Sequence, residues 1–270
     1  MRVLHIWNTA GVASILAKYQ RKLLGWDTWV IMRKKYDKYG VTTYGALYNC
    51  DTISFYIIAM ALASKYDIIH VHSLDRIVLV IKKVYKKKPV ILHYHGSDIR
   101  GLWDKKKRYW SKADKIIVAT EDLLKDAPPN ATFLPNPVDT EIFKPMPKLR
   151  RKKWALFIYS SEKKHRVSLS WAKEIAKSLK LKLYILNRET KPIPYKAMPH
   201  ILNRFEYFID HRYVEALSKT ALEALACGLK VIRWDKKILN TLPHVHYPQR
   251  IIKELTNIYY EASSREHKSF

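Results

Sequence analysis

The chain has 270 residues, 48% of them hydrophobic and 12% aromatic, with 50 Lys and Arg against 24 Asp and Glu. This composition excludes a disordered chain and allows one large core or two smaller ones. The formal net charge of +26 indicates an anionic partner, whether nucleic acid, an anionic membrane or a phosphorylated substrate.

Basic clusters are spread along the whole chain. They lie at residues 33–35, 82–83, 86–88, 105–108, 148–153 and 163–166. Many of these side chains can be solvated surface, and the usage of Lys, Tyr and Ile also fits a hot habitat. Cys50 and Cys227 form no disulfide framework, which favours a reducing cytoplasm.

The first half of the chain alternates short β-branched runs with helical segments. Strands are predicted at 2–7, 28–32, 67–72, 90–95, 115–119 and 132–134, and helices at 12–24, 52–64, 77–85 and 103–112. Because Met1 leads directly into a strand, we expect no signal peptide. The longest apolar run, 52–63, is too short to span a bilayer and predicts a buried helix. Apolar strands alternating with helices predict a parallel sheet covered on both faces.

Polar residues follow two of these strands. Asn8-Thr-Ala-Gly11 lies between the first strand and its helix but lacks the spacing of a dinucleotide-binding loop. His95-Gly-Ser-Asp98 ends the fourth strand in a tight turn, at the sheet edge where ligands of open α/β folds bind. The alternative is that Ser97 and Asp98 cap the following helix.

Two histidine pairs, His70-x-His72 and His93-x-His95, each place two imidazoles on one face of a strand. If the two strands are neighbours, four imidazoles approach one another in a way that suits Zn²⁺ or another transition metal. The alternative is that both pairs merely end strands near polar loops.

A Pro-rich stretch over residues 134–147 and a basic run over 148–153 predict a hinge. We therefore expect a domain at 1–134, a linker at 135–153, a second domain at 154–247 and a C-terminal helix at 248–270 that crosses back to the first domain. In the second half, strands are predicted at 155–159, 181–186, 207–210 and 230–234, and helices at 168–180, 199–205, 221–227 and 250–262.

The segment from Glu215 to Glu223 places two carboxylates on either side of Ser218, Lys219 and Thr220. A helix starting there would present unpaired backbone N–H groups and a positive dipole end to phosphate, with Glu223 near sugar hydroxyls. The alternative is a capping box, Thr220-x-x-Glu223, which needs no ligand.

These motifs, in this order, resemble retaining glycosyltransferases of family 4. The resemblance covers the His95 turn, the connector Asn136-Pro-Val-Asp139 with Phe143-Lys-Pro145, and the two glutamates separated by seven residues. The chain departs from the family where a glycine-rich loop should follow Glu215, and Ser161 stands where the family has an Arg. The implied fold is GT-B, with two Rossmann-like domains whose parallel sheets face each other across a cleft.

The resemblance also implies roles for individual residues. His95 and Glu215 would act on the transferred sugar, and Gly11 and Asp98 would border the acceptor. The donor-binding residues would be Lys164, Arg166, Ser218, Lys219, Thr220 and Glu223. The implied reaction moves a hexose from a UDP- or GDP-sugar, the donor substrate, to a glycan, lipid or other hydroxyl acceptor, with no metal and no further cofactor.

Two other functions compete with this interpretation. The first is a basic protein that binds nucleic acid or an anionic surface on an inactive transferase scaffold, although aromatic and basic residues do not alternate as in a stacking platform. The second is a metal-dependent hydrolase that uses the four histidines. We expect a cytoplasmic protein that contacts the inner face of the membrane peripherally.

Overall fold

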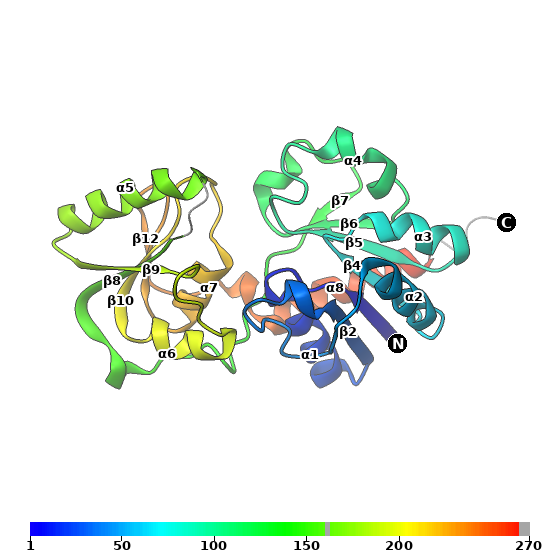
Figure 1. The fold of residues 1–270 in the computed structure, drawn as a ribbon, viewed down its shortest axis with the longest axis horizontal. Helices are drawn as coiled ribbons and strands as arrows, with labels where there is room; N and C mark the ends of the chain where they lie inside the picture. Colours follow the sequence, from blue (N-terminus) through cyan, green and yellow to red (C-terminus); the bar gives the residue numbers. More distant parts are fainter. Residues whose placement is uncertain (160–162, 265–270) are drawn as a thin grey trace. The chain divides into compact units, whose positions relative to one another are not determined.

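The computed structural model describes residues 1–159 and 163–264, with the backbone alone for 163–167. The chain forms two compact units, shown in Figure 1. Unit 1 comprises Met1–Pro137 and Pro248–Phe270, and unit 2 comprises Val138–Tyr247.

Unit 1 is built on a seven-stranded sheet with the order β3-β2-β1-β4-β5-β6-β7, in which every pairing is parallel. The strands are β1 (Arg2–Ile6), β2 (Asp27–Arg33), β3 (Ala46–Tyr48), β4 (Ile68–His72), β5 (Val90–Tyr94), β6 (Lys115–Val118) and β7 (Ala131–Phe133). The strand order reverses between β1 and β4, and ligands of such sheets bind beyond the carboxyl ends of the strands at this reversal.

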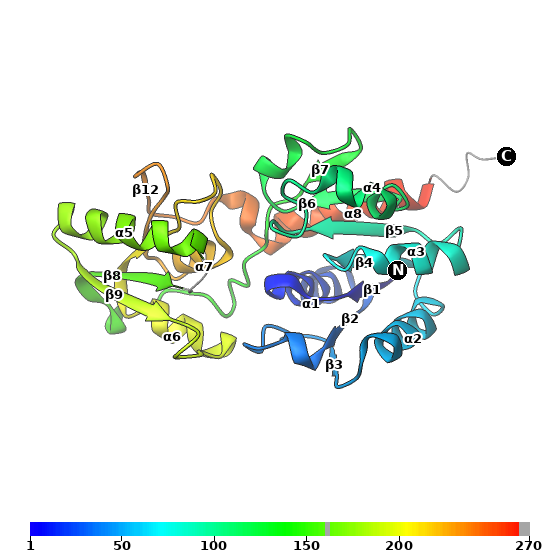
Figure 2. The same ribbon diagram turned by 45° about the horizontal axis from the view of Figure 1, so that its top comes forward.

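Helices cover both faces of this sheet. They are α1 (Val12–Leu24), α2 (Thr52–Ala63), α3 (Arg76–Val84), α4 (Trp103–Trp110) and α8 (Pro248–Ser264). Although α8 follows unit 2 in the sequence, it packs beside α1, and Leu255 and Tyr259 share a buried cluster with Leu16. Figure 2 shows α2 and α3 away from α1, and their buried residues belong to the cluster on the opposite face.

Helix α2 corrects one prediction. It was expected to be buried, but Ile53 is 75% exposed and Ile57 is 63% exposed. Phe55, Ala59 and Ala63 contact the sheet because their spacing of four residues places them on one side of the helix. The other side is apolar and open. Among the described residues, no helix is both long and apolar enough to cross a bilayer.

Unit 2 has a five-stranded sheet with the order β12-β11-β10-β8-β9. The strands are β8 (Arg151–Tyr159), β9 (Lys182–Asn187), β10 (Phe205–Ile209), β11 (Lys230–Ile232) and β12 (Ile238–Leu239). The first four are parallel, and β12 adds an antiparallel edge. Strand β8 begins within the segment expected to be linker, because Arg151 pairs with the start of β10.

The helices of unit 2 are α5 (Lys163–Ser178), α6 (Met198–Leu202) and α7 (Lys219–Ala226). Figure 1 shows α5 on one face of the sheet and α6 on the other. Trp171 and Ile175 of α5 pack on Phe157 in the core. The strand order here reverses between β8 and β10, so the polypeptide that leaves β10 toward α7 lies at the second position favoured for ligands.

Candidate functional site

The carboxyl ends of β1 and β4 carry strained backbone. Trp7 directly follows β1 with a φ of 74°, Ala10 has a φ of 51°, and Ser73 directly follows β4 with a φ of 60°. Each left-handed non-glycine residue costs on the order of 1–3 kcal/mol, and such residues concentrate at functional sites. No pattern in the sequence indicated this strain, since none of the three residue types favours a positive φ.

The turn after β5 is held by Asp98. Its carboxylate accepts hydrogen bonds from the backbone N–H groups of His95 (3.0 Å) and Gly96 (2.7 Å). The Ser73 hydroxyl donates to the same carboxylate at 2.6 Å and lies 2.7 Å from the Thr9 hydroxyl. Asp98 therefore joins the ends of β4 and β5, and Ser73 extends the contact to Thr9 after β1. The capping alternative is wrong, because α4 starts later and has no side-chain cap.

His95 is a neutral imidazole in this turn. Its Nε2 lies 3.0 Å from His72 Nδ1. Burial lowers the pKa of His95 to about 4, although the Asp98 carboxylate and a hydrogen bond with Asn136 act in the opposite direction. At neutral pH the ring can exchange hydrogen bonds with a ligand but carries no charge. Gly11, with a φ of 78°, caps α1 in the left-handed conformation.

The two predicted histidine pairs do lie on neighbouring strands, with His72 directly opposite His93. His5 of β1 joins them, and its Nδ1 lies 3.1 Å from His72 Nε2. Sequence reasoning missed His5 because it stands alone in its strand, 65 residues before His70. The cluster is therefore larger than the pattern predicted.

In unit 2, Ser218 fixes the start of α7. Its hydroxyl accepts a hydrogen bond from the Ala221 N–H (3.1 Å), and its own N–H donates to Asp210 at the end of β10 (2.9 Å). The capping box is therefore wrong, since Thr220 is inside the helix. Within the part of the chain that the structure describes, the N–H groups of Lys219 and Thr220 have no protein partner, as expected at a helix start.

Glu223 is the fifth residue of α7 and is 3% exposed, whereas in the helix predicted at 221–227 it was the third residue. The Tyr195 hydroxyl donates to Glu223 Oε1 (2.9 Å), and Lys219 Nζ lies 3.1 Å from the same oxygen. Burial and the neighbouring Glu223 raise the pKa of Tyr195, so this hydroxyl stays a donor. Both contacts use Oε1, and Oε2 has no hydrogen bond among the described residues. Nothing in the sequence singled out Tyr195.

Among the described residues, the structure shows no hydrogen bond or ion pair between the other predicted site residues of unit 2 and this group of polar residues at α7. Glu215 is exposed in the loop between β10 and α7. Lys164 and Arg166 lie in the first turn of α5, and their side chains are outside the described residues, as is Ser161. The polar group that the structure does assemble around α7 therefore consists of Asp210, Tyr195, Ser218, Lys219 and Glu223.

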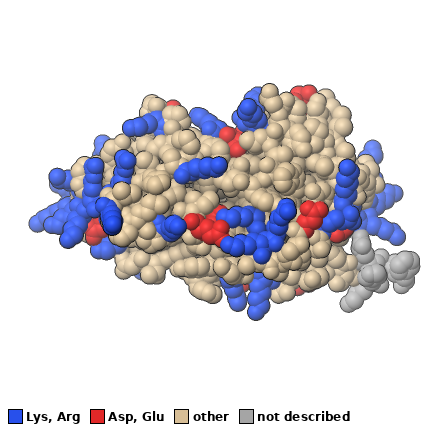
Figure 3. All heavy atoms as spheres, turned by 90° about the horizontal axis from the view of Figure 1, so that it is seen from below, with Lys and Arg blue, Asp and Glu red and all other residues tan. Residues whose placement is uncertain are grey.

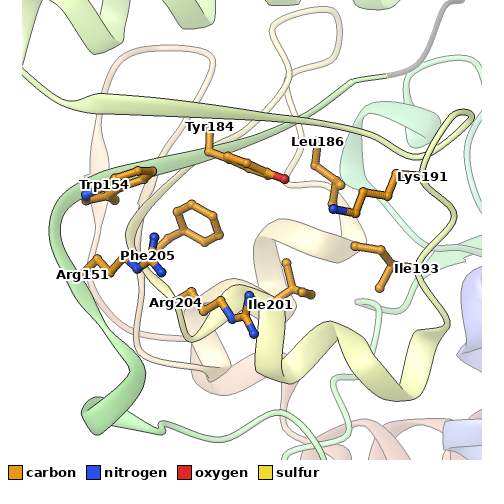
Figure 4. A pocket seen from close by; sticks show the side chains of 9 residues that line it. All are labelled: Arg151, Trp154, Tyr184, Leu186, Lys191, Ile193, Ile201, Arg204 and Phe205. Atoms are coloured by element: carbon orange, nitrogen blue, oxygen red, sulfur yellow. The ribbon is translucent and has the colours of Figure 1, made fainter.

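A pocket of about 240 Å³ lies elsewhere in unit 2, between the sheet and α6 (Figure 4). It is lined by Arg151, Trp154, Tyr184, Leu186, Lys191, Ile193, Ile201, Arg204 and Phe205. Arg151 and Phe205 are the first residues of their strands. This pocket is therefore at the amino ends of β8 and β10, whereas α7 starts beyond the carboxyl end of β10.

Comparison with known proteins shows what the chain is similar to. The model of Glycosyltransferase Family 4 matches residues 16–142. The chain is glycosyltransferase family 4-like. Among curated protein sequences, none is significantly similar to it. The family match lies almost entirely in unit 1 and ends well before Glu215, so it does not cover the two glutamates.

Solved structures with the same fold cover nearly the whole chain. A sucrose-phosphate synthase from Thermosynechococcus elongatus has a TM-score of 0.58 at 11% identity, covering 98% of this chain and 92% of its own. An alpha-glucosyltransferase solved with UDP and a 13-mer DNA has a TM-score of 0.55 at 13% identity, and the match covers 100% of this chain and 93% of that protein. MnaA from S. aureus, solved with UDP, has a TM-score of 0.50 at 10% identity, covering 98% and 91%.

At these identities the solved structures establish the fold alone, which is that of GT-B glycosyltransferases. The family model and this fold together support a glycosyltransferase of the GT-B type. The expected α/β architecture is thereby confirmed.

Proposed function

We propose that the protein is a retaining glycosyltransferase that moves a hexose from a UDP- or GDP-sugar to a hydroxyl acceptor. The observation that carries the proposal is the start of α7. Among the described residues, two backbone N–H groups there have no partner, and the helix dipole is positive at this end. The buried carboxylate of Glu223 lies in the same helix, and its Oε2 has no hydrogen bond to a described residue.

In this proposal the diphosphate is bound by the N–H groups of Lys219 and Thr220, and Glu223 Oε2 accepts hydrogen bonds from ribose hydroxyls. Lys164 and Arg166 supply positive charge to the leaving diphosphate, so that departure rests on fixed protein charge and no metal is required. Glu215 and His95 keep the roles on the transferred sugar that the family resemblance implies, and Gly11 and Asp98 those on the acceptor side. The neutral state of His95 suits contact with a sugar hydroxyl rather than with phosphate.

A thermal-shift screen against nucleotides and nucleotide sugars tests donor binding. A ligand at 100 times its Kd should add about 2.7 kcal/mol of stability. Glu223→Gln should abolish the shift because the amide cannot replace a charged acceptor. Glu174→Gln, on an exposed position of the same unit, should leave it unchanged. Absence of a shift with every UDP and GDP compound, or an equal shift in Glu223→Gln, would refute the proposal. NMR of the product's anomeric configuration then tests retention.

A second candidate function is binding of nucleic acid on an inactive scaffold. It is favoured by the net charge of +26 and by the Lys and Arg side chains spread over the surface in Figure 3. A protein of the same fold was solved with both UDP and DNA. DNA is therefore also a candidate acceptor for the first function, the glycosyltransferase. Binding to DNA that weakens steeply with salt, without binding of any nucleotide sugar, would select this function over the first.

For the first function we propose an acceptor at an anionic membrane surface, contacted through α2. Ile53 and Ile57 are exposed on this helix, and Val84, at the end of α3, is 59% exposed. Lys88 donates to backbone carbonyls at the C-terminal end of α2, which places the basic run 86–88 beside it. Exposed apolar and basic side chains together favour an anionic interface.

A further inference from the structure

Five imidazoles lie on one face of the sheet of unit 1, the face covered by α1 and α8. His5 of β1 is directly opposite His70 of β4, and His72 is directly opposite His93 of β5. Because side chains alternate along a strand, His95 points to the same side. The first four rings are 0% exposed. Of these five histidines, only His95 has a role in the proposed transfer reaction.

Three of these rings have one nitrogen held by an outer partner. His5 Nε2 lies 2.8 Å from Gln20 Oε1 of α1, and His70 Nδ1 lies 2.7 Å from the Tyr259 hydroxyl of α8. His72 Nδ1 lies 3.0 Å from His95 Nε2. Metal-binding histidines in proteins characteristically use their second nitrogen in this way, which fixes the ring and its tautomer.

The same three rings also approach one another. One ring nitrogen from each of His5, His70 and His72 lies within 4.8 Å of the other two. His5 Nδ1 is 3.1 Å from His72 Nε2, and His70 Nε2 is buried without a hydrogen-bond partner among the described residues. Nitrogens that share a tetrahedral Zn²⁺ at about 2.0–2.1 Å are about 3.3 Å apart, which is close to the 3.1 Å between His5 Nδ1 and His72 Nε2. A buried polar atom without a partner is costly, which favours an occupant.

We propose that His5 Nδ1, His70 Nε2 and His72 Nε2 bind a transition-metal ion of the Zn²⁺ class. Imidazole ligands without carboxylates select such ions over Mg²⁺ and Ca²⁺. Binding needs two linked tautomer changes: His72 carries its proton on Nδ1 and donates it to His95 Nε2, and His95 therefore carries its own proton on Nδ1.

The neighbouring group His72, His93 and His95 also brings its nitrogens within 4.8 Å of one another. It is the weaker candidate, because neither nitrogen of His93 has an outer partner among the described residues. The ion proposed here is structural and joins β1 to β4. It does not depend on the glycosyltransferase proposal, and the ion takes no part in the metal-independent transfer.

The experiment is refolding of the whole chain with one equivalent of Zn²⁺ or, separately, Co²⁺, followed by dialysis against a weak chelator and metal analysis. Refolding is used because a fully buried site loads as the chain folds. We expect one ion per wild-type chain and, for Co²⁺, the visible spectrum of a tetrahedral nitrogen site. His70→Gln should retain no ion. His93→Gln, a change in the same cluster, should retain one. Gln20→Leu should weaken binding by about 10–100-fold.

Three results would overturn the proposal: no stoichiometric ion in the wild type, an equal ion content in His70→Gln, or loss of the ion in a natively folded His93→Gln. Should a variant fail to fold, X-ray absorption of the wild-type Zn²⁺ protein decides instead. Three imidazole ligands support the site, and scattering from oxygen ligands alone rejects it.

Discussion

Replacing Glu223 tests how α7 is organised. The side chain of Glu223 is 3% exposed and that of Lys219 is 11% exposed, with 3.1 Å between their charged atoms. Glu223→Leu removes the carboxylate and leaves the Lys219 ammonium and the Tyr195 hydroxyl without it. Breaking a buried ion pair by removing one partner costs about 3–5 kcal/mol, and an unsatisfied buried hydroxyl costs about 1–3 kcal/mol.

A loss of this size is a large part of the 5–15 kcal/mol typical of a folded domain. The paired change Glu223→Leu with Lys219→Met should recover about 2 kcal/mol or more, because no unpaired charge stays buried. As a control, Glu254→Leu breaks an exposed ion pair, in which the Arg250 side chain is 48% exposed and the Glu254 side chain 35%. This change should cost less than about 1 kcal/mol.

Hydrogen exchange is the appropriate assay, because unfolding of two units need not follow a two-state model. The unit 2 amides report on the Glu223 and Lys219 variants, and the unit 1 amides report on the Glu254 control, which lies in α8. The reasoning would be refuted by a cost of less than about 1 kcal/mol for Glu223→Leu. It would also be refuted if the double variant lost as much stability as the two single variants combined, because the pair would then be uncoupled.

Three further predictions follow from other parts of unit 1. Gly45→Ala should lower the free energy of unfolding in urea by more than about 2 kcal/mol, because the added Cβ would lie 2.3 Å from the Val30 carbonyl oxygen. Gly25→Ala, where the added Cβ meets open space, should cost about 1 kcal/mol. Burial lowers the pKa of His5 to about 4, so the unfolded chain binds more protons below pH 6.5. In the metal-free protein, His5 alone should remove about 1.4 kcal/mol of stability per pH unit between pH 6.5 and 4. The free energy of unfolding should be measured at pH 7, 6 and 5, and an unchanged value would contradict this prediction. Ile57→Glu should reduce sedimentation with anionic vesicles, and unchanged binding would exclude α2 as the contact.

Local chemistry allowed much of the fold to be predicted. The sequence predicts α1 at residues 12–24, as observed, because apolar spacing defines the helix and Gly25 ends it in the left-handed conformation. It predicts the polar turn at Asp98 and the helix after Ser218 for similar reasons. It did not predict the short edge strands β3 and β12, whose two or three residues carry no period to detect.

The sequence by itself determined the βα order, the apolar strands of a parallel sheet and the positions of the polar turns, because these depend on residues within a few positions of each other. Only the tertiary structure decided which side chains meet. Tyr259 reaches Gln20 across 239 residues and His70 across 189, and Tyr195 reaches Glu223 from outside its helix. Such contacts depend on strand order and on the return of α8 to unit 1, which no local period encodes.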